Sequence, residues 1–315
     1  MTDTPFISWI GHGAAELAPP GIFSGAKASA FVIEADKAAM QRTTDLLLNP
    51  AGGGQVRYDV LAGVSLVTFM DIAKCTSTTE TVGWLPGRET AFWVPLVETH
   101  PGDPLRDRLI LWAPYIFINY TIGMVTGREG WGWPKTLADI TVASDDPANP
   151  SYACVTTYFP TLADTTQGVT GRLFSITAAS PQRPTSPIWK TGAEAVAALV
   201  GAALGDVASP LVKALDLKPQ APCVVLKQIR DTSAPAMACY QAIVDSPVEL
   251  TNFQGGGLLP GDFTLEITTC ESHQIVPDLL GRAPDPGSTK VPVKFAIWSV
   301  VDFNALSGAN IVVAT

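Results

Sequence analysis

The feature that most constrains how this 315-residue chain can fold is its succession of short apolar segments, rich in Val, Ile, Thr and aromatic residues. Segments of this kind, which alternate or run apolar between turn residues, are typical of β-strands. Turns that contain Pro or Gly separate them along most of the sequence. We therefore predict a fold dominated by β-structure, with strands at residues 56–63, 65–74, 90–98, 109–118, 139–144, 152–159, 171–179, 222–230, 238–246, 262–270 and 291–303.

Two segments carry helical signals instead. The first, "KAAMQRTTDLLL", follows Asp36, which is suited to an N-cap, and it stops at Pro50. The second is the alanine-rich stretch 192–215. Because the turns recur too regularly to mark a domain linker, we predict a single domain over residues 1–315, with an inserted helical segment at 181–220.

The charge balance argues against two classes of partner. The chain has 20 Lys and Arg against 29 Asp and Glu, a net charge of −9 at pH 7. Such a chain has no basic footprint for nucleic acid or for an anionic membrane surface. Its first residues lack the basic and apolar regions of a leader, and no uninterrupted run of about 18 apolar residues follows. We expect a cytoplasmic protein with no nucleic-acid or membrane partner.

Several common site motifs are missing from the sequence. Its five cysteines are scattered and odd in number, and neither they nor the three histidines have metal-ligand spacing. We expect reduced thiols and no metal site. The glycine-rich "QGGGLLPG" lacks the spacing of a phosphate-binding loop, and no Gly-x-Ser-x-Gly elbow occurs.

One lysine, Lys135, stands in an unusual setting, the stretch "GREGWGWPKT" (127–136). In one interpretation it is a structural lysine at a turn after Pro134. Its alkyl chain then passes Trp131 or Trp133 and its ammonium reaches water. In the other interpretation it is a nucleophile held in an apolar pocket.

A nucleophilic lysine makes a demand on its surroundings. A Schiff base forms from the neutral amine, whereas an ordinary lysine, with a pKa of about 10.4, is almost wholly protonated at pH 7. The pocket must therefore disfavour the ammonium by about 4–5 kcal/mol. Burial among the indoles of the "GWGW" spacer would supply this.

The segment "NYTIGMVTGREGWGWPKTLADI" (119–140) resembles the signature of the acetoacetate decarboxylase superfamily. In that signature Gly-Arg-Glu, a short aromatic and glycine spacer, and Pro-Lys follow one another. Upstream, "GRETAFWVPL" (87–96) is similar to the family's Glu-x5-Pro strand, and residues 31–50 look like its strand followed by a helix. The segments "LEITTCESHQIVPDLLG" and "VPVKFAIWSVVDF" resemble its closing strands in pattern.

The resemblance implies an α+β, mostly β fold, which is a cone-like, largely antiparallel β-barrel with peripheral helices and a pocket inside. Such an interior, lined by alternate strand residues, is a natural place to exclude water from a lysine. By position Lys135 matches the family's Schiff-base nucleophile, and Glu89 matches its active-site glutamate. The resemblance also implies a homo-oligomer, a tetramer or larger ring, and chemistry that needs no metal or organic cofactor.

Three positions depart from the decarboxylase pattern. Thr136 stands where decarboxylases carry a second lysine, and Met70 stands where they carry a further glutamate. Near Lys27 there is no counterpart of their substrate-linked arginine. The Schiff-base centre is retained, but decarboxylation does not follow from it. Without the second lysine, exclusion of water has to supply nearly all of the effect that makes Lys135 a neutral amine.

Four residues are candidates for substrate contacts. Arg88 and Arg128 are placed by the resemblance near the site and could bind a carboxylate through paired hydrogen bonds. Each can equally form a structural pair with a nearby acid. Trp133 and Met70 are expected to contact the substrate from the aromatic spacer and from the neighbouring strand.

We expect a Schiff-base-forming lyase that acts on a small β-keto or 2-oxo acid. Its lysine iminium would be an electron sink for decarboxylase, aldolase or dehydratase chemistry, with Glu89 moving protons. Two alternatives stay open. One is a true acetoacetate decarboxylase. The other is a non-catalytic relative that binds a small ligand, an interpretation favoured by the three departures and by the insertion at 181–220.

Overall fold

A large sheet of thirteen strands dominates the described part of the chain, and a sheet of three strands accompanies it. The computed structural model describes residues 5–8, 10–13, 16–142, 152–179, 185–204 and 220–313. The large sheet contains β1 (Gly21–Glu34), β2 (Arg57–Val60), β3 (Val64–Ser77), β4 (Leu85–Thr99), β5 (Arg108–Ile118), β6 (Lys135–Leu137), β7 (Asp139–Thr141), β8 (Tyr152–Tyr158), β9 (Val169–Ala178), β10 (Gln220–Ala221), β13 (Val248–Leu258), β14 (Phe263–Thr268) and β15 (Ser288–Ala305). The smaller sheet contains β11 (Val224–Arg230), β12 (Ala238–Asp245) and β16 (Ala309–Val313).

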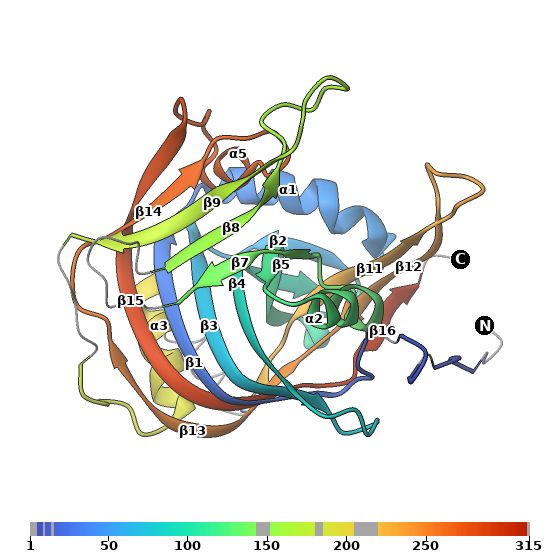
Figure 1. Cartoon of the computed structure of the whole chain (residues 1–315), viewed down its shortest axis with the longest axis horizontal. Coiled ribbons are helices and arrows are strands. Elements are labelled where there is room, and N and C mark those ends of the chain that lie inside the picture. Colours follow the sequence, from blue (N-terminus) through green and yellow to red (C-terminus); the bar gives the residue numbers. More distant parts are fainter. Residues whose placement is uncertain are drawn as a thin grey trace.

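The predicted β-dominated fold is confirmed. Each of the eleven predicted segments contains all or part of a strand, from β2 to β15, although residues 143 and 144 lie outside the described ranges. The main path of the large sheet is β6-β5-β4-β3-β1-β15-β14-β9-β8-β7. Its neighbours are antiparallel except for β5 and β6, which are parallel. Figure 1 shows β15, β1, β3 and β4 side by side as long, strongly curved strands.

The predicted closed barrel is not confirmed. The path of paired strands starts at β6 and ends at β7, and within the described ranges these two end strands do not pair with each other. They are consecutive in the chain, separated only by Ala138. The sheet is curved and largely antiparallel. Because its two end strands do not pair with each other in the described residues, hydrogen bonding does not close it into a barrel.

The main core lies where β8 and β9 pack against the central strands. Phe174 of β9 meets Phe92 of β4 in an edge-to-face contact with ring centroids 4.9 Å apart, and it meets Phe117 of β5 at 5.6 Å. Tyr152 of β8 packs edge-on against Phe31 of β1 at 4.9 Å. Burial of such large aromatic side chains stabilises the curved arrangement. Side chains alternate along a strand, so the residues between them point to the opposite face of the sheet.

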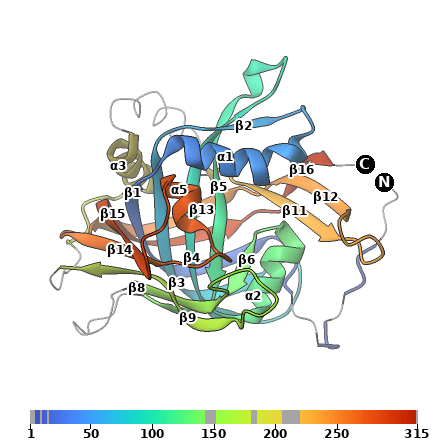
Figure 2. The same cartoon turned by 90° about the horizontal axis from the view of Figure 1, so that it is seen from above.

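Helices lie outside the strands. α1 (Lys37–Leu47) begins as predicted, because Asp36 Oδ1 accepts a hydrogen bond from Ala39 N at 2.6 Å. It is followed by the 3-10 turn η1 (Asn49–Gly52), which contains Pro50. Beside it lies α5 (Ile275–Leu280), and Asp36 N donates to Leu279 O at 2.8 Å. Figure 2 shows α1 and α5 next to each other on the outside of the sheet.

Within the predicted helix at 192–215 the structure has α3 (Gly192–Leu204), which packs against β13, β15 and β1. The rest of the predicted 192–215 helix, like residues 181–184 and 205–219, lies outside the described residues. A shorter 3-10 turn, η2 (Pro104–Arg106), precedes β5. Among the helices in the described ranges, none combines the length and the apolar character that crossing a membrane requires.

Candidate active site

The stretch that carries Lys135 is a crossover between two parallel strands. The chain leaves the sheet at the end of β5 and passes through the short helix α2 (Thr121–Val125) and the π-helical turn η3 (Thr126–Trp131). It returns as β6, where Lys135 is the register partner of Ile116. Parallel strands need such a crossover, and π-helical turns are frequent at functional sites.

Glycines in the motif make room for the lysine. A Cβ atom on Gly127 would lie 2.4 Å from Lys135 Cδ and 2.8 Å from its Cε, so the alkyl chain of the lysine runs directly over that glycine. The Gly127 carbonyl accepts hydrogen bonds from Gly132 N at 2.9 Å and Trp133 N at 2.8 Å, which closes the turn. Gly132 has a φ of +99°, a conformation that favours glycine. Gly127, the first residue of the Gly-Arg-Glu motif, therefore leaves room for the lysine side chain.

The structure brings Lys135 and Glu89 together. Lys135 Nζ lies 2.5 Å from Glu89 Oε2, and the two side chains are only 11% and 12% exposed. The lysine reaches from β6 past β5 to β4, and the contact forms on the face of the sheet opposite the main core. The sequence argument relied on apolar surroundings alone to remove the proton from this amine. In the structure the carboxylate of Glu89 also touches the amine directly.

A small cavity adjoins Lys135. Its volume is about 50 Å³, and its apolar walls include Leu17, Phe23, Trp131 and Trp133. This is enough space for a few water molecules or a very small organic ligand. The two indoles are 4% and 6% exposed. The "GWGW" spacer therefore lines the site, as the sequence predicted, and Trp133 lies beside the lysine.

The tryptophans are held from the other side by the smaller sheet. Trp131 and Trp133 belong to a cluster of buried residues that includes Val225 of β11 and Val244 of β12. Trp131 Nε1 donates to Leu306 O at 2.9 Å, which fixes its indole. A close-packed cluster of this kind keeps water away from the walls of the cavity.

The N-terminal segment covers one side of the cavity. Leu17 N donates to Thr126 Oγ1 at 2.8 Å, and Ala18 N donates to Glu80 Oε2 at 3.0 Å. Ser77 Oγ donates to Ala18 O at 2.6 Å. Sequence reasoning missed this cover, because a short polar and proline-containing stretch carries no periodic signal.

Two further polar residues face the cavity and were also missed. Tyr120 and Cys75 both line it. Burial raises the pKa of Cys75 to about 11, and the charge of Glu89 acts in the same direction, against the effects of Tyr120 and Lys135. Burial also raises the pKa of Tyr120, with further contributions from Cys75 and Glu89. Both groups are therefore protonated at neutral pH.

The structure does not bring the predicted arginines to the cavity. Arg88 points to the other face of β4, where its Nε lies 3.3 Å from Asp71 Oδ1 and its guanidinium donates to Ile140 O at 3.1 Å. Arg128 is exposed and donates to the backbone carbonyl of Lys135 at 3.2 Å. Arg88 therefore forms the structural pair with an acid that the sequence left open as an alternative, whereas the partner of Arg128 is a backbone carbonyl.

Met70 is near the site without lining the cavity. It is the register partner of Glu89 on the adjacent strand, so the two side chains lie on the same face. It packs against a small buried cluster formed by Ala26, Ile72 and Cys75. An apolar side chain here stands next to the carboxylate that contacts Lys135.

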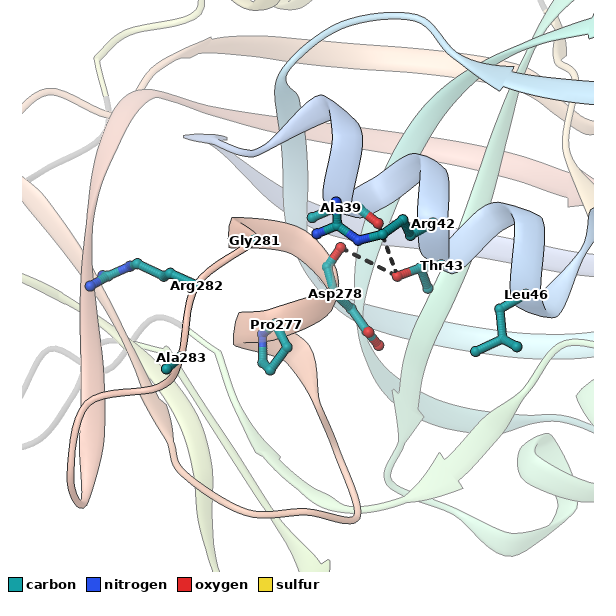
Figure 3. A pocket seen from close by; sticks show the side chains of 9 residues that line it. All are labelled: Ala39, Arg42, Thr43, Leu46, Pro277, Asp278, Gly281, Arg282 and Ala283. Carbon is teal, nitrogen blue, oxygen red and sulfur yellow. Dashed lines mark hydrogen bonds between the residues drawn. The ribbon is translucent and has the colours of Figure 1, made fainter.

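The described part of the chain has another hollow and no metal site. No group of three or more His, Cys, Asp or Glu residues within the described ranges could hold a metal ion. A larger hollow of about 320 Å³ lies between α1 and α5, lined in part by Arg42 and Arg282 (Figure 3). Thr43 Oγ1 donates to Asp278 O at 3.4 Å across it. It shares no lining residue with the cavity at Lys135.

Neither a protein-family model nor a curated protein matches the sequence. Solved structures do match. Acetoacetate decarboxylase from Legionella pneumophila subsp. pneumophila str. Philadelphia 1 has a TM-score of 0.59 at 15% identity, over 99% of this chain and 94% of that chain. An acetoacetate decarboxylase-like enzyme from Sphingomonas wittichii RW1 has a TM-score of 0.56 at 14% identity, over 94% of each chain. The enduracididine biosynthesis enzyme MppR, complexed with pyruvate, has a TM-score of 0.50 at 15% identity, over 96% of this chain and 93% of that chain.

These matches extend over nearly the whole length of each chain, at identities that carry information about the fold alone. The protein therefore has the acetoacetate decarboxylase-like fold, as the resemblance of segments 119–140 and 87–96 predicted. Within that fold, the site described above is a buried lysine and carboxylate pair beside a small apolar cavity.

Proposed function

We propose that this protein is a Schiff-base-forming lyase for a small keto acid, with Lys135 as nucleophile and Glu89 as proton shuttle. The observation that carries the proposal is the 2.5 Å contact between Lys135 Nζ and Glu89 Oε2 at the edge of a small, mostly apolar cavity. Transfer of one proton across this contact turns an ammonium and a carboxylate into a neutral amine and a carboxylic acid. The ion pair would thereby become a nucleophile and a general acid in one step.

The remaining steps follow from that transfer. The neutral amine adds to the ketone carbon, the carbonyl oxygen gains protons, and water leaves to give an iminium. Glu89 is the group in contact with the amine that can move these protons. The iminium nitrogen then accepts the electron pair released when a bond to the adjacent carbon breaks.

The class of substrate is supported by the structural neighbours. They include acetoacetate decarboxylase, whose substrate is a β-keto acid, and a structure of MppR with pyruvate, a 2-oxo acid. We propose the same broad class here, together with the family's cone-like barrel as the description of the curved sheet. Thr136 in place of a second lysine favours aldolase or dehydratase chemistry over decarboxylation.

The proposal is tested by reductive trapping. The protein is incubated with pyruvate or acetoacetate and borohydride, and its intact mass is measured. We expect one adduct in the wild-type protein, none in Lys135→Ala, and an unchanged adduct in Lys74→Ala, which removes an exposed lysine elsewhere on β3. Absence of an adduct with every keto acid tried would contradict the lyase proposal.

A second candidate function is non-catalytic binding of a small ligand. It is favoured by the positions of Arg88 and Arg128, neither of which lines the cavity. Under this alternative, Lys135→Ala would bind the ligand normally and neither form would turn it over. A true acetoacetate decarboxylase would instead release CO2 from acetoacetate, and its loss in Lys135→Ala would identify it.

A further inference from the structure

Tyr120 is held in the cavity with unusual rigidity. A Cβ atom on Gly87 would lie 2.5 Å from Tyr120 Cε1, and one on Gly123 would lie 2.5 Å from its Cζ. The ring is thus enclosed between the backbone of β4 and the backbone of α2, each of which has a glycine at the point of contact. A side chain held this closely can present its hydroxyl in one position with little loss of entropy on binding.

The Tyr120 hydroxyl has no hydrogen-bond partner among the described residues of the ligand-free site. The thiol of Cys75 lines the same cavity. Sulfur is a weak acceptor compared with a carbonyl or alkoxide oxygen. A ligand oxygen that enters the cavity would therefore be a better partner for this hydroxyl than Cys75.

Three other polar groups around the cavity have partners already. Thr76 Oγ1 donates to Gly83 O at 2.6 Å, and Trp131 Nε1 donates to Leu306 O at 2.9 Å. Thr126 Oγ1 accepts from Leu17 N at 2.8 Å, so one side of that hydroxyl is occupied by the N-terminal cover. Of the two donors that remain, the Tyr120 hydroxyl and the Trp133 indole N–H, the phenol is the stronger.

Resting on the function proposed above, we infer that the Tyr120 hydroxyl is the donor that stabilises the reacting oxygen of the substrate. When Lys135 Nζ forms its bond to the carbonyl carbon, the electron pair of the C=O π bond moves to oxygen. The Tyr120 O–H donates a hydrogen bond to that oxygen and keeps its own proton. The protons that convert the oxygen to water come from the amine through Glu89, so charge and protons balance.

The chemical state of the phenol fits this role. Burial, Cys75 and the charge of Glu89 all raise the pKa of Tyr120, which makes it a permanent donor at neutral pH and not a base. The two groups therefore have different roles in the proposed reaction. Glu89 moves protons, and Tyr120 stabilises the negative charge that develops on oxygen.

The test is Tyr120→Phe, which keeps the enclosed ring and removes only the hydroxyl. We expect the rate of borohydride-trapped adduct formation with pyruvate to fall about 100-fold, as for loss of one oxyanion donor, with the thermal midpoint unchanged. Tyr240→Phe, the same change on β12 where the hydroxyl contacts Asn310, is the matched control and should react like wild type. Equal rates for wild type and Tyr120→Phe would overturn the inference while the lyase proposal stands.

Two other outcomes are also decisive. If wild type forms no adduct, the proposed function fails and this inference fails with it. If Tyr120→Phe unfolds early, 3-fluorotyrosine introduced at position 120 keeps the packing and makes the hydroxyl a stronger donor. Faster trapping than wild type would then support the assignment, and an unchanged rate would refute it.

Discussion

At the scale of single residues, the fit between Gly127 and the Lys135 side chain fixes the position of the amine. The alkyl chain lies where a Cβ atom on residue 127 would be, at 2.4 Å from Cδ. In Gly127→Ala the lysine must move away from that contact, and Nζ moves with it relative to Glu89. We expect the rate of adduct trapping to fall by about 100-fold, the usual effect of a displacement of about 1 Å in a reacting group.

The motif itself supplies a matched control for this prediction. A Cβ atom on Gly130 would meet no atom closer than 3.8 Å, where Pro19 Cγ lies. Gly130→Ala should therefore trap the keto acid at the wild-type rate. Similar rates for the two alanine variants would mean that the glycine at 127 does not position the lysine.

Lys135 and Glu89 could be proposed from the sequence because each stands in a short motif of the chain. Tyr120 and Cys75 could not, since one directly precedes α2, the other lies in β3, and they meet only through the fold. The prediction that Arg88 contacts the substrate could have been rejected from the sequence alone. Neighbouring residues on a strand face opposite sides, so a glutamate at 89 that faces the site directs residue 88 away from it.

At the scale of secondary-structure elements, a buried polar network joins β4 and β5 to the smaller sheet. Glu98 of β4 is 1% exposed and accepts hydrogen bonds from Arg108 Nε at 2.8 Å and Tyr58 OH at 3.1 Å. Arg108 also donates to Asp245 Oδ2 of β12 at 2.8 Å. Burial by itself would raise the pKa of Glu98, but the hydrogen bonds from Arg108 and its other partners outweigh burial and lower it.

Glu98→Gln should therefore destabilise the fold in a pH-dependent way. At pH 7 we expect a loss of about 1.5–3 kcal/mol in the free energy of unfolding, because Arg108 would lose one of its two counter-charges. The folded-state pKa of Glu98 is lowered, so its stabilising effect is present above the unfolded-state value of about 4.3 and disappears as pH falls through the folded-state value.

Urea unfolding at several pH values measures this effect. The gap between wild type and Glu98→Gln should narrow in acid, whereas Glu34→Gln, at a side chain that is 75% exposed, should show little loss at any pH. A gap that stayed constant down to the acid transition would show that the charge of Glu98 is not the cause.

Most elements were predictable because alternation between turns is a local signal. β13 is one of the strands that lie outside the predicted segments. Its glycine-rich stretch "QGGGLLPG" is typical of a turn, but Gly255, Gly256 and Gly257 continue the strand. Because glycine has no side chain, the segment before α3 packs directly against the backbone of these residues. Gly256 O accepts hydrogen bonds from both Ile188 N and Trp189 N. The reason for these glycines is a tertiary contact, which a local pattern does not reveal.

At the scale of the whole molecule, the resemblance to acetoacetate decarboxylases predicts a homo-oligomer. Several large apolar side chains in the described ranges are exposed, among them Leu105 at 98%, Ile7 at 80% and Phe6 at 73%. We expect light scattering after size exclusion to give a multiple of 33.2 kDa, with four or more copies. A monomer at micromolar concentration would contradict this prediction.

Curvature of the sheet could be expected from the family resemblance, but closure could not be decided from the sequence. Whether β6 and β7 form a ladder depends on the turn at Ala138 and on the register of every strand between them. The size of the cavity has the same origin. It is set by where the tryptophans of η3 meet β11 and β12, contacts between parts of the chain about 100 residues apart.

The central claim is that Lys135 forms an iminium that acts as an electron sink. Its most direct test is exchange of the α-hydrogens of pyruvate or acetone for deuterium in D2O, followed by NMR. We predict exchange catalysed by the wild-type protein and only the background rate with Lys135→Ala. Exchange at equal rates with the two proteins, or none above background with either, would contradict the claim.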